Sequence, residues 1–176
     1  AVGQKDVRST PLQVTRAFAA IANGGSLVRA QIVKQFEDLH GNVIRVPQSS
    51  SDAKLPINDD ELAQIREGLW RVVNDERGTA FNARVDGIEV AGKTGTAEYS
   101  GKRDMDGKLP SHAWFAGYAP AERPEFAFAV LVRDGGEGAF AAAPIARDIV
   151  DYLMTGELPT LPQDRPDFVP PTRRLG

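Results

Sequence analysis

The chain has 176 residues, 41% of them hydrophobic and 26% charged, which is the balance of a globular domain long enough to bury a core. Its net charge of -3 and its pI near 5.4 argue against nucleic-acid binding, which needs a clustered basic surface. Because the chain has no cysteine and only two histidines, His40 and His112, the sequence predicts neither a disulfide framework nor a metal site.

The first predicted helix begins at Pro11. Thr10 is a suitable N-cap, proline suits the first helical position, and Gln13 completes a capping box with Thr10. Apolar residues follow at helical spacing. Asn23-Gly24-Gly25 then supplies residues that tolerate the left-handed conformation at a helix end, so the helix is expected to stop there.

Extended chain is predicted after this helix. Residues 27–36 and 43–46 are rich in apolar and β-branched residues, and His40-Gly41-Asn42 between them favours a turn. Residues 48–54 are polar and rich in serine, which predicts a loop.

A second helix is predicted from Asn58, with Glu61 as its capping partner three residues later. Residues 74–78 mark its end, and a short helical turn is expected at residues 79–83. Four apolar positions at helical spacing form its expected buried face. They are Leu62, Ile65, Leu69, and Val72 or Val73.

Three strands are predicted in the second half of the chain: residues 88–98, 112–118 and 125–133. A charged loop at 99–111 separates the first two, and the connection at 119–124 is short enough for an antiparallel hairpin. Residues 126–132 show almost no polar alternation and are therefore expected to be covered on both faces. The fold class predicted is α+β, with an antiparallel sheet and helices on both of its faces.

A last helix is predicted from about Ala142 to Met154, with Pro144 in its first turn. Residues 156–176 are rich in proline, which is incompatible with a regular helix or a central strand. They are predicted to be an extended or disordered C-terminal tail.

The candidate site is Lys93-Thr94-Gly95-Thr96, in the first predicted strand of this sheet. Lys93 supplies a fixed positive charge, and the hydroxyl groups of Thr94 and Thr96 can bind a carboxylate. Gly95 has no Cβ and would let a substrate backbone lie close to the strand. A backbone N–H at a strand edge could also point at a developing oxyanion.

Taken alone, a K-T-G tripeptide is a weak signal, and a bulge in an edge strand with an exposed lysine is the alternative. The flanking sequence makes the signal specific, because several blocks resemble class B penicillin-binding proteins in the order typical of that family. These blocks are Gly3-Gln4, Thr10-Pro11-Leu12-Gln13, the segment from Arg16 to Gly25, the segment from Ala91 to Glu98, the segment from His112 to Pro120, and Ala143-Pro144-Ile145-Ala146.

The resemblance covers about residues 1–155 and implies a peptidoglycan D,D-transpeptidase that cross-links stem peptides through an acyl-serine intermediate and is acylated by β-lactams. Lys93 and Thr96 are the implied catalytic residues. Lys93 would act electrostatically beside the serine, and the N–H of Thr96 would form half of the oxyanion hole. Thr94, Gly95 and Thr96 are the implied substrate-binding residues, with the two threonines holding the carboxylate.

The same resemblance implies the penicillin-binding protein/serine β-lactamase-like fold, with residues 1–155 as the C-terminal half of the transpeptidase domain. The family's S-x-N motif is absent from this chain. Its one S-x-x-K match, Ser51-Asp52-Ala53-Lys54, lies in a predicted polar loop just before Pro56, and not at the start of a buried helix far upstream. We therefore expect the nucleophile to lie outside this chain, and the chain alone to be inactive.

The implied partners are the upstream half of the same protein with the S-x-x-K and S-x-N motifs, the stem peptide, β-lactams and the cell-wall synthesis complex. No cofactor and no nucleic acid are implied. The apolar runs at residues 17–22 and 126–132 are much shorter than the roughly 20 residues of a membrane span. The chain also starts at Ala1 without a signal sequence, so an anchor on the extracytoplasmic face of the bacterial inner membrane is expected upstream.

Two alternatives remain open at this point. A D,D-carboxypeptidase or serine β-lactamase relative would share the K-T-G strand, although the Gly3-Gln4 and Thr10-Pro11-Leu12-Gln13 blocks favour class B. A non-catalytic β-lactam sensor or scaffold module would keep the fold without the reaction.

Other residues near the motif are expected to be structural. His112 is predicted to be a strand-edge residue packed near the site and not a general base. Trp114 and Phe115 alternate across their strand, so one is expected in the core and the other on the opposite face. Trp70 is predicted to be a core residue.

Overall fold

The computed structural model describes residues 8–48 and 50–158. Within them the chain forms three helices, α1 (Pro11–Ala22), α2 (Asp59–Asn74) and α3 (Gly138–Thr155), and one short turn of 3-10 helix, η1 (Phe81–Ala83). The strands are β1 (Ser26–Val28), β2 (Phe36–Glu37), β3 (Val43–Arg45), β4 (Ser51–Lys54), β5 (Ala91–Glu98), β6 (Ser111–Ala119) and β7 (Phe126–Val132). Most of the predicted proline-rich tail, from residue 159 onward, lies outside the described residues.

The first two helices begin where their capping boxes predict. Thr10 accepts from the Gln13 N–H at 3.3 Å, while its own N–H donates to the Gln13 side chain at 2.8 Å. Asn58 and Glu61 make the same reciprocal pair, both bonds at 2.9 Å. Each pair satisfies backbone N–H groups that the first turn of a helix leaves without a partner. Both predicted helices are thereby confirmed.

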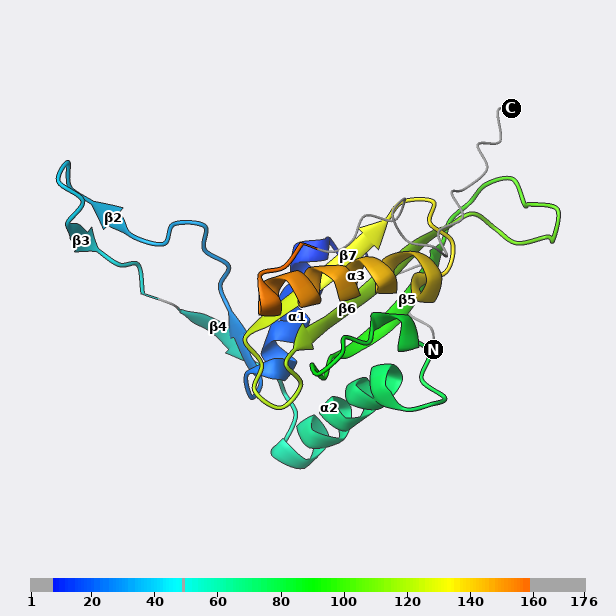
Figure 1. Ribbon diagram of the computed structural model, residues 1–176, viewed down its shortest axis with the longest axis horizontal. Helices are drawn as coiled ribbons and strands as arrows, with labels where there is room; N and C mark the ends of the chain where they lie inside the picture. The colour runs from blue at the N-terminus through cyan, green and yellow to red at the C-terminus, as the bar shows by residue number, and fades with distance from the viewer. Residues whose placement is uncertain (1–7, 49, 159–176) are drawn as a thin grey trace.

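β5, β6 and β7 form an antiparallel sheet in that order, and its two registers run without a bulge. α3 crosses one face of this sheet and contacts all three strands, while α1 lies behind it against β6 and β7 (Figure 1). α2 packs beside β5. The predicted α+β architecture with helices on both faces of an antiparallel sheet is confirmed. The first strand starts at Ala91 and not at residue 88.

The main hydrophobic core lies between α3 and the sheet. Phe115 of β6 and Val90, just before β5, belong to one cluster with Ala146 and Val150 of α3, and all four are fully buried. α3 and α1 contact β7 from its two faces, which agrees with the cover expected for residues 126–132, although only Phe128 is buried. The described residues supply no strand for the outer edge of β7, and this leaves its side chains half-exposed.

Two predictions about the helices are wrong in detail, one about the buried face of α2 and one about the start of α3. In α2, Leu62 and Val73 are buried, whereas Ile65 is 39% exposed because the helix touches the body mainly along β5. α3 begins at Gly138, so Pro144 lies inside the helix rather than in its first turn. α3 stops where Gly156 takes up a left-handed conformation, with φ of 77°. No helix in residues 8–48 and 50–158 is long and apolar enough to cross a membrane.

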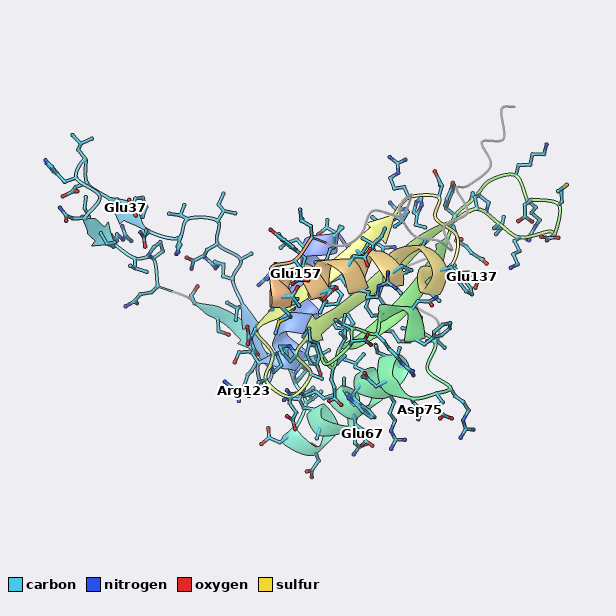
Figure 2. The ribbon with its side chains drawn as sticks, in the orientation of Figure 1. Glu37, Glu67, Asp75, Arg123, Glu137 and Glu157 are labelled. Carbon is cyan, nitrogen blue, oxygen red and sulfur yellow. The ribbon has the colours of Figure 1, made fainter. Side chains whose placement is uncertain are left out.

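Residues 29–48, called the arm here, project away from the sheet and carry the short β2–β3 pair (Figure 1). Figure 2 shows Glu37 at the outer end of the arm, far from Glu137 at the start of α3. At the base of the arm, β4 pairs with β1. The loop predicted for residues 48–54 is therefore wrong over Ser51–Lys54, because β1, whose paired residues lie 23 to 28 positions earlier in the sequence, supplies the hydrogen bonds that a local pattern does not indicate.

Candidate active site

The K-T-G motif lies in the middle of β5, which is an edge strand of the sheet and pairs only with β6 among the described strands. Thr94 lies opposite Phe115, and Thr96 lies opposite Ala113. Because side chains alternate along a strand, both threonines point to the face that α3 covers. Lys93 starts on the other face.

The Lys93 side chain nevertheless turns back toward Thr94. Its Nζ donates to the Thr94 carbonyl oxygen at 3.0 Å and lies 3.4 Å from Thr94 Oγ1. Lys93 is exposed and Thr94 is half-buried. The strand thus presents an ammonium group and a hydroxyl group within a few ångströms of each other at the surface, which is a suitable pair for a carboxylate.

The backbone N–H of Thr96 points away from β6, toward the outer edge of β5. The Tyr99 N–H donates to the Pro110 carbonyl at 3.0 Å, which makes Tyr99 a hydrogen-bonded position of the β5–β6 ladder. Hydrogen-bonded and non-hydrogen-bonded pairs alternate in an antiparallel ladder, and this ladder has no register shift. Three positions earlier, Thr96 is therefore a non-hydrogen-bonded position whose N–H is directed away from β6.

Gly95 is closely packed within the chain itself. A Cβ on Gly95 would lie 3.2 Å from Trp114 Cβ on one face of the sheet. On the other face lies Gly138, the first residue of α3, whose own Cβ would lie 2.6 Å from the Gly95 carbonyl oxygen and 2.2 Å from that of Trp114. The start of α3 thus rests directly on the backbone of the K-T-G strand.

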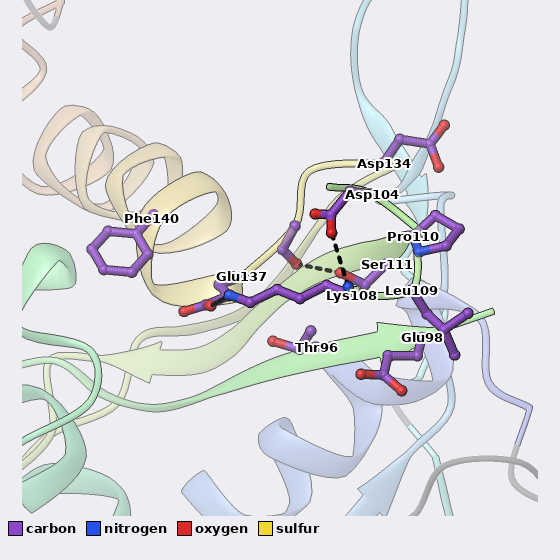
Figure 3. Close-up of a pocket in the computed structure, with 11 residues that line it drawn as sticks. Thr96, Glu98, Asp104, Lys108, Leu109, Pro110, Ser111, Asp134, Glu137 and Phe140 are labelled. Atoms are coloured by element: carbon purple, nitrogen blue, oxygen red, sulfur yellow. Dashed lines mark hydrogen bonds and ion pairs between the residues drawn. The ribbon is translucent and has the colours of Figure 1, made fainter. Parts of the chain in front are cut away.

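A pocket of about 560 Å³ opens beside Thr96. It lies between the end of β5, the loop of residues 99–110 and the turn between β7 and α3. Figure 3 shows Thr96 below the Lys108–Glu137 pair, with Phe140 of α3 at one end. The charged loop thus forms a wall of this pocket. Neither Lys93 nor Thr94 lines it.

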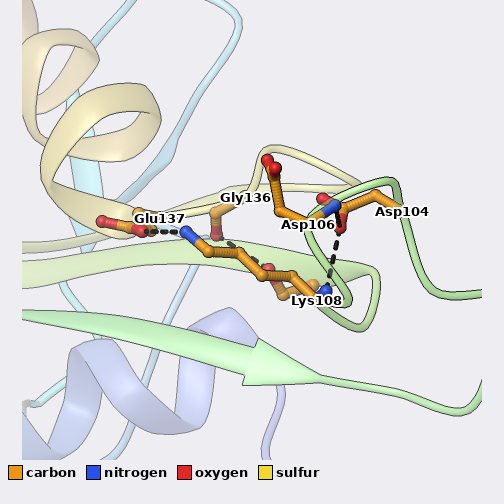
Figure 4. Close-up of polar contacts among 6 residues, drawn as sticks. Asp104, Asp106, Lys108, Gly136 and Glu137 are labelled. Carbon is orange, nitrogen blue, oxygen red and sulfur yellow. Dashed lines mark hydrogen bonds and ion pairs between the residues drawn. The ribbon is translucent and has the colours of Figure 1, made fainter.

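The loop of residues 99–110 is closed by its own contacts, and an ion pair connects it to the residue before α3. The Asp104 carboxylate accepts from the N–H groups of Asp106 at 3.0 Å and Lys108 at 2.8 Å. Lys108 Nζ then lies 3.3 Å from the Glu137 carboxylate (Figure 4). Both side chains of this pair are more than half exposed, so the pair holds the loop only weakly.

His112 has the structural role predicted for it. Its Nδ1 accepts from the Asp134 backbone N–H at 3.1 Å, and its ring stacks on Tyr99 with 4.7 Å between the centroids. The Tyr99 hydroxyl bonds to the Asp134 carboxylate, and this hydrogen bond raises the pKa of the Tyr99 phenol. Phe115 is buried in the core and Trp114 is half-buried on the opposite face, as their alternation predicts. Trp70, predicted to be a core residue, is only half-buried.

Ser51 lies in β4 at the base of the arm, on the other side of the molecule from the 99–110 end of β5 (Figure 1). Its Oγ bonds to the carbonyl oxygen of Ala53 at 3.0 Å. Among the described residues, the hydrogen-bond partners of this hydroxyl are two backbone carbonyl oxygens, those of Leu27 and Ala53, and neither is a base. In the part of the chain that the structure describes, no group of three or more His, Asp or Glu side chains is arranged to hold a metal ion.

One contact of the motif involves a residue that the sequence did not single out. Thr79, in the turn between α2 and η1, places its Oγ1 3.3 Å from Thr94 Oγ1. The two threonines are 15 residues apart, and no local pattern indicates that they meet.

Comparison with known proteins gives the family of the chain. The model described as the penicillin binding protein transpeptidase domain matches residues 1–151. Peptidoglycan D,D-transpeptidase MrdA of Haemophilus influenzae is 32% identical over 170 residues, which are 90% of this chain and 26% of MrdA. Peptidoglycan D,D-transpeptidase PbpA of Mycobacterium tuberculosis is 34% identical over 164 residues, which are 89% of this chain and 31% of PbpA.

Solved structures of penicillin-binding proteins also resemble this chain. Penicillin-binding protein A from M. tuberculosis, in an imipenem acyl-enzyme complex, superimposes with a TM-score of 0.71 at 33% identity, over 86% of this chain and 32% of that one. Pseudomonas aeruginosa PBP2 in complex with WCK 5153 gives 0.68 at 29% identity, over 90% of this chain and 33% of that one. The chain spans between a quarter and a third of the length of these relatives. It belongs to the penicillin-binding protein transpeptidase domain family.

Proposed function

We propose that this chain supplies one wall of the active site of a peptidoglycan D,D-transpeptidase, with the nucleophilic serine on a preceding part of the same protein. In the reaction the serine oxygen attacks the scissile carbonyl of a stem peptide. The tetrahedral intermediate then collapses to an acyl-serine and releases the terminal residue. The amine of a second stem peptide takes the acyl group, frees the serine and completes the cross-link.

The observation that carries this proposal is the position of the Lys93 ammonium group beside the Thr94 hydroxyl on an edge strand, at 3.4 Å. An ammonium group is a donor only, and a threonine hydroxyl can both donate and accept. Together they suit the carboxylate of a stem peptide or of a β-lactam, and Thr96 on the same face as Thr94 offers a second hydroxyl. Lys93 would also place a positive charge beside the attacking serine, where negative charge develops before the neutral acyl-serine forms.

The proposed oxyanion donor is the Thr96 backbone N–H, which is directed to the outer edge of β5. A donor fixed by the strand backbone needs no rearrangement when charge develops on the carbonyl oxygen, and removing one such donor typically costs about 10²–10³ in rate. The outer edge of β5, which has no strand partner among residues 8–48 and 50–158, also allows an extended stem peptide to pair with it as an added strand. Gly95, Thr94 and Thr96 are thus the proposed substrate-binding residues.

Two features support a second half of the domain. The outer edge of β7 has no strand partner among residues 8–48 and 50–158, and six of its seven residues are only half-buried. Ser51 in β4 has only backbone carbonyl partners and is not proposed as the nucleophile. We propose residues 1–155 as the C-terminal half of the domain, working in a cell-wall synthesis complex on the extracytoplasmic face of the inner membrane.

Acylation by a fluorescent penicillin tests the proposal. We expect the full-length protein to be labelled on a serine outside this chain, and the isolated chain to remain unlabelled. Lys93→Ala in the full-length protein should slow acylation by about 10²-fold or more, the range for losing a preorganised charged donor. Lys34→Ala on the arm is the matched control and should label at the wild-type rate. Labelling of Ser51, or an unchanged rate for Lys93→Ala, would refute the proposed site.

A further inference from the structure

Thr79 makes a contact with the K-T-G strand that has no part in the function proposed above. Its Oγ1 lies 3.3 Å from Thr94 Oγ1, and either oxygen can be the donor. Lys93 Nζ lies 3.4 Å from the same Thr94 oxygen. The Thr94 hydroxyl is thus shared between an ammonium group and a second hydroxyl, both supplied by this chain.

The turn that carries Thr79 has a fixed position. The Gly78 N–H donates to the Asp75 carbonyl at 2.9 Å, and the Ala80 N–H donates to the Val72 carbonyl at 2.9 Å. A Cβ on Gly78 would lie 2.4 Å from the Val72 carbonyl oxygen, so only glycine fits there. Ala80, directly after Thr79, is fully buried. The backbone on both sides of Thr79 therefore determines where its hydroxyl lies.

The end of α2 lies just before this turn, and it is also hydrogen-bonded to the residue that precedes β5. The Asn74 side-chain amide donates to the Val90 carbonyl at 2.9 Å, immediately before β5 begins. The Arg84 guanidinium donates to the carbonyl oxygens of Val73 at 2.7 Å and Asp75 at 2.7 Å, which are carbonyls at the end of α2. The end of α2, the turn and the start of β5 thus form one connected unit, and the distance between Thr79 and Thr94 is set by it.

The direction of the hydrogen bonds follows from the groups available. A hydroxyl donates once and accepts up to twice, an ammonium group only donates, and a carboxylate only accepts. When a carboxylate binds at Thr94, the Thr94 hydroxyl has to donate to it, and its oxygen is then left to accept. Among the described residues, Lys93 and Thr79 each place a donor within reach of that oxygen.

We propose that Thr79 is a positioning residue for carboxylate recognition, with its hydroxyl donating to Thr94 Oγ1 so that the Thr94 proton is directed to the ligand carboxylate. This inference rests on the proposed function, because it assigns Thr79 a role in binding the same carboxylate. Thr79 acts through Thr94 and is not required to touch the ligand.

The test compares second-order acylation rates of the full-length protein for two probes, a penicillin with a free carboxylate and its methyl ester. Thr79→Val removes the hydroxyl and keeps the shape, whereas Thr79→Ser keeps the hydroxyl. We expect Thr79→Val to slow the free acid by about two- to tenfold, the range for one hydrogen bond, and to leave the ester rate unchanged. Thr79→Ser should restore the free-acid rate. Thr15→Val in α1, whose hydroxyl bonds to the Pro11 carbonyl at 3.0 Å, is the control for a lost threonine hydroxyl elsewhere.

A second arm repeats Thr79→Val in a Thr94→Val background, where no further slowing is expected because the partner oxygen is gone. Equal slowing of both probes would overturn the inference, since it would indicate a disturbed fold. Additive slowing in the Thr94→Val background would overturn it as well, because Thr79 would then act on the ligand directly. If the wild-type protein is acylated by neither probe, the proposed function fails and this inference fails with it. Acylation of the wild type with no effect of Thr79→Val refutes the inference alone.

Discussion

Gly138→Ala is expected to displace the K-T-G strand from the start of α3. The added methyl group would lie 2.2 Å from the Trp114 carbonyl oxygen, 2.6 Å from the Gly95 carbonyl oxygen and 3.0 Å from the Gly95 nitrogen. All three atoms belong to the backbone, so no side-chain rotation can relieve the contact, and the helix or the strand has to move. Overpacking usually costs 1–3 kcal/mol, and this site should fall at the upper end, about 2–3 kcal/mol.

Gly68→Ala in α2 is the matched control. It also adds one methyl group and removes the same freedom from the unfolded chain, but it meets no heavy atom within 4 Å. A glycine replaced by alanine inside a helix should stabilise the protein by about 0.4–1 kcal/mol. The difference in stability between the two variants therefore measures the cost of the clash at Gly138.

Amide hydrogen exchange in the full-length protein, followed by mass spectrometry, measures the effect where it should occur. A loss of about 2–3 kcal/mol corresponds to about 30- to 150-fold faster exchange of the β5 and β6 amides if local opening controls exchange. Acylation by penicillin should slow in the same variant, because Thr96 and Lys93 move with the strand. Wild-type exchange at β5 in Gly138→Ala would contradict the contact between α3 and the K-T-G strand.

Three further predictions concern stability. Thr10→Ala should lower the free energy of unfolding by about 1 kcal/mol in urea titrations, because it removes the N-cap of α1; no change would mean that water replaces the cap. Lys108→Ala should change the same quantity by less than about 1 kcal/mol, since its ion pair is exposed, and a larger loss would show that the loop is held more firmly than its contacts indicate. Burial raises the pKa of the Tyr118 phenol above its usual value of 10.0, and the neighbouring Arg66 offsets only part of this. The neutral phenol is favoured in the folded state, so this contribution is complete below pH 10 and is lost as the pH rises through the folded pKa. The free energy of unfolding of Tyr118→Phe should therefore fall less than that of the wild type between pH 9 and pH 11. If the two proteins lose the same free energy over this range, the raised pKa of Tyr118 is refuted.

The family could be predicted from the sequence because several independent blocks occur in one order around K-T-G, and the comparisons confirm it. Composition and periodicity also predict the α+β class, since the helical and strand patterns lie in separate parts of the chain. The proposed roles of Lys93, Thr94, Gly95 and Thr96 derive from the resemblance, and they remain predictions that acylation kinetics have to test.

Local interactions are what the sequence determined by itself. The capping boxes pair residues three positions apart, Thr10 with Gln13 and Asn58 with Glu61, so one short segment of chain carries all their atoms. The alternation that separates Phe115 from Trp114 is equally local, because it follows from the geometry of a single strand.

Only the tertiary structure decided the contacts made between distant segments. β4 exists because β1 supplies its hydrogen bonds, and Gly138 is a glycine because the Gly95 backbone lies against it. The meeting of Thr79 with Thr94 depends on the end of α2 being joined to β5. Such contacts form at distances that the folded backbone sets, and no short stretch of sequence contains both partners.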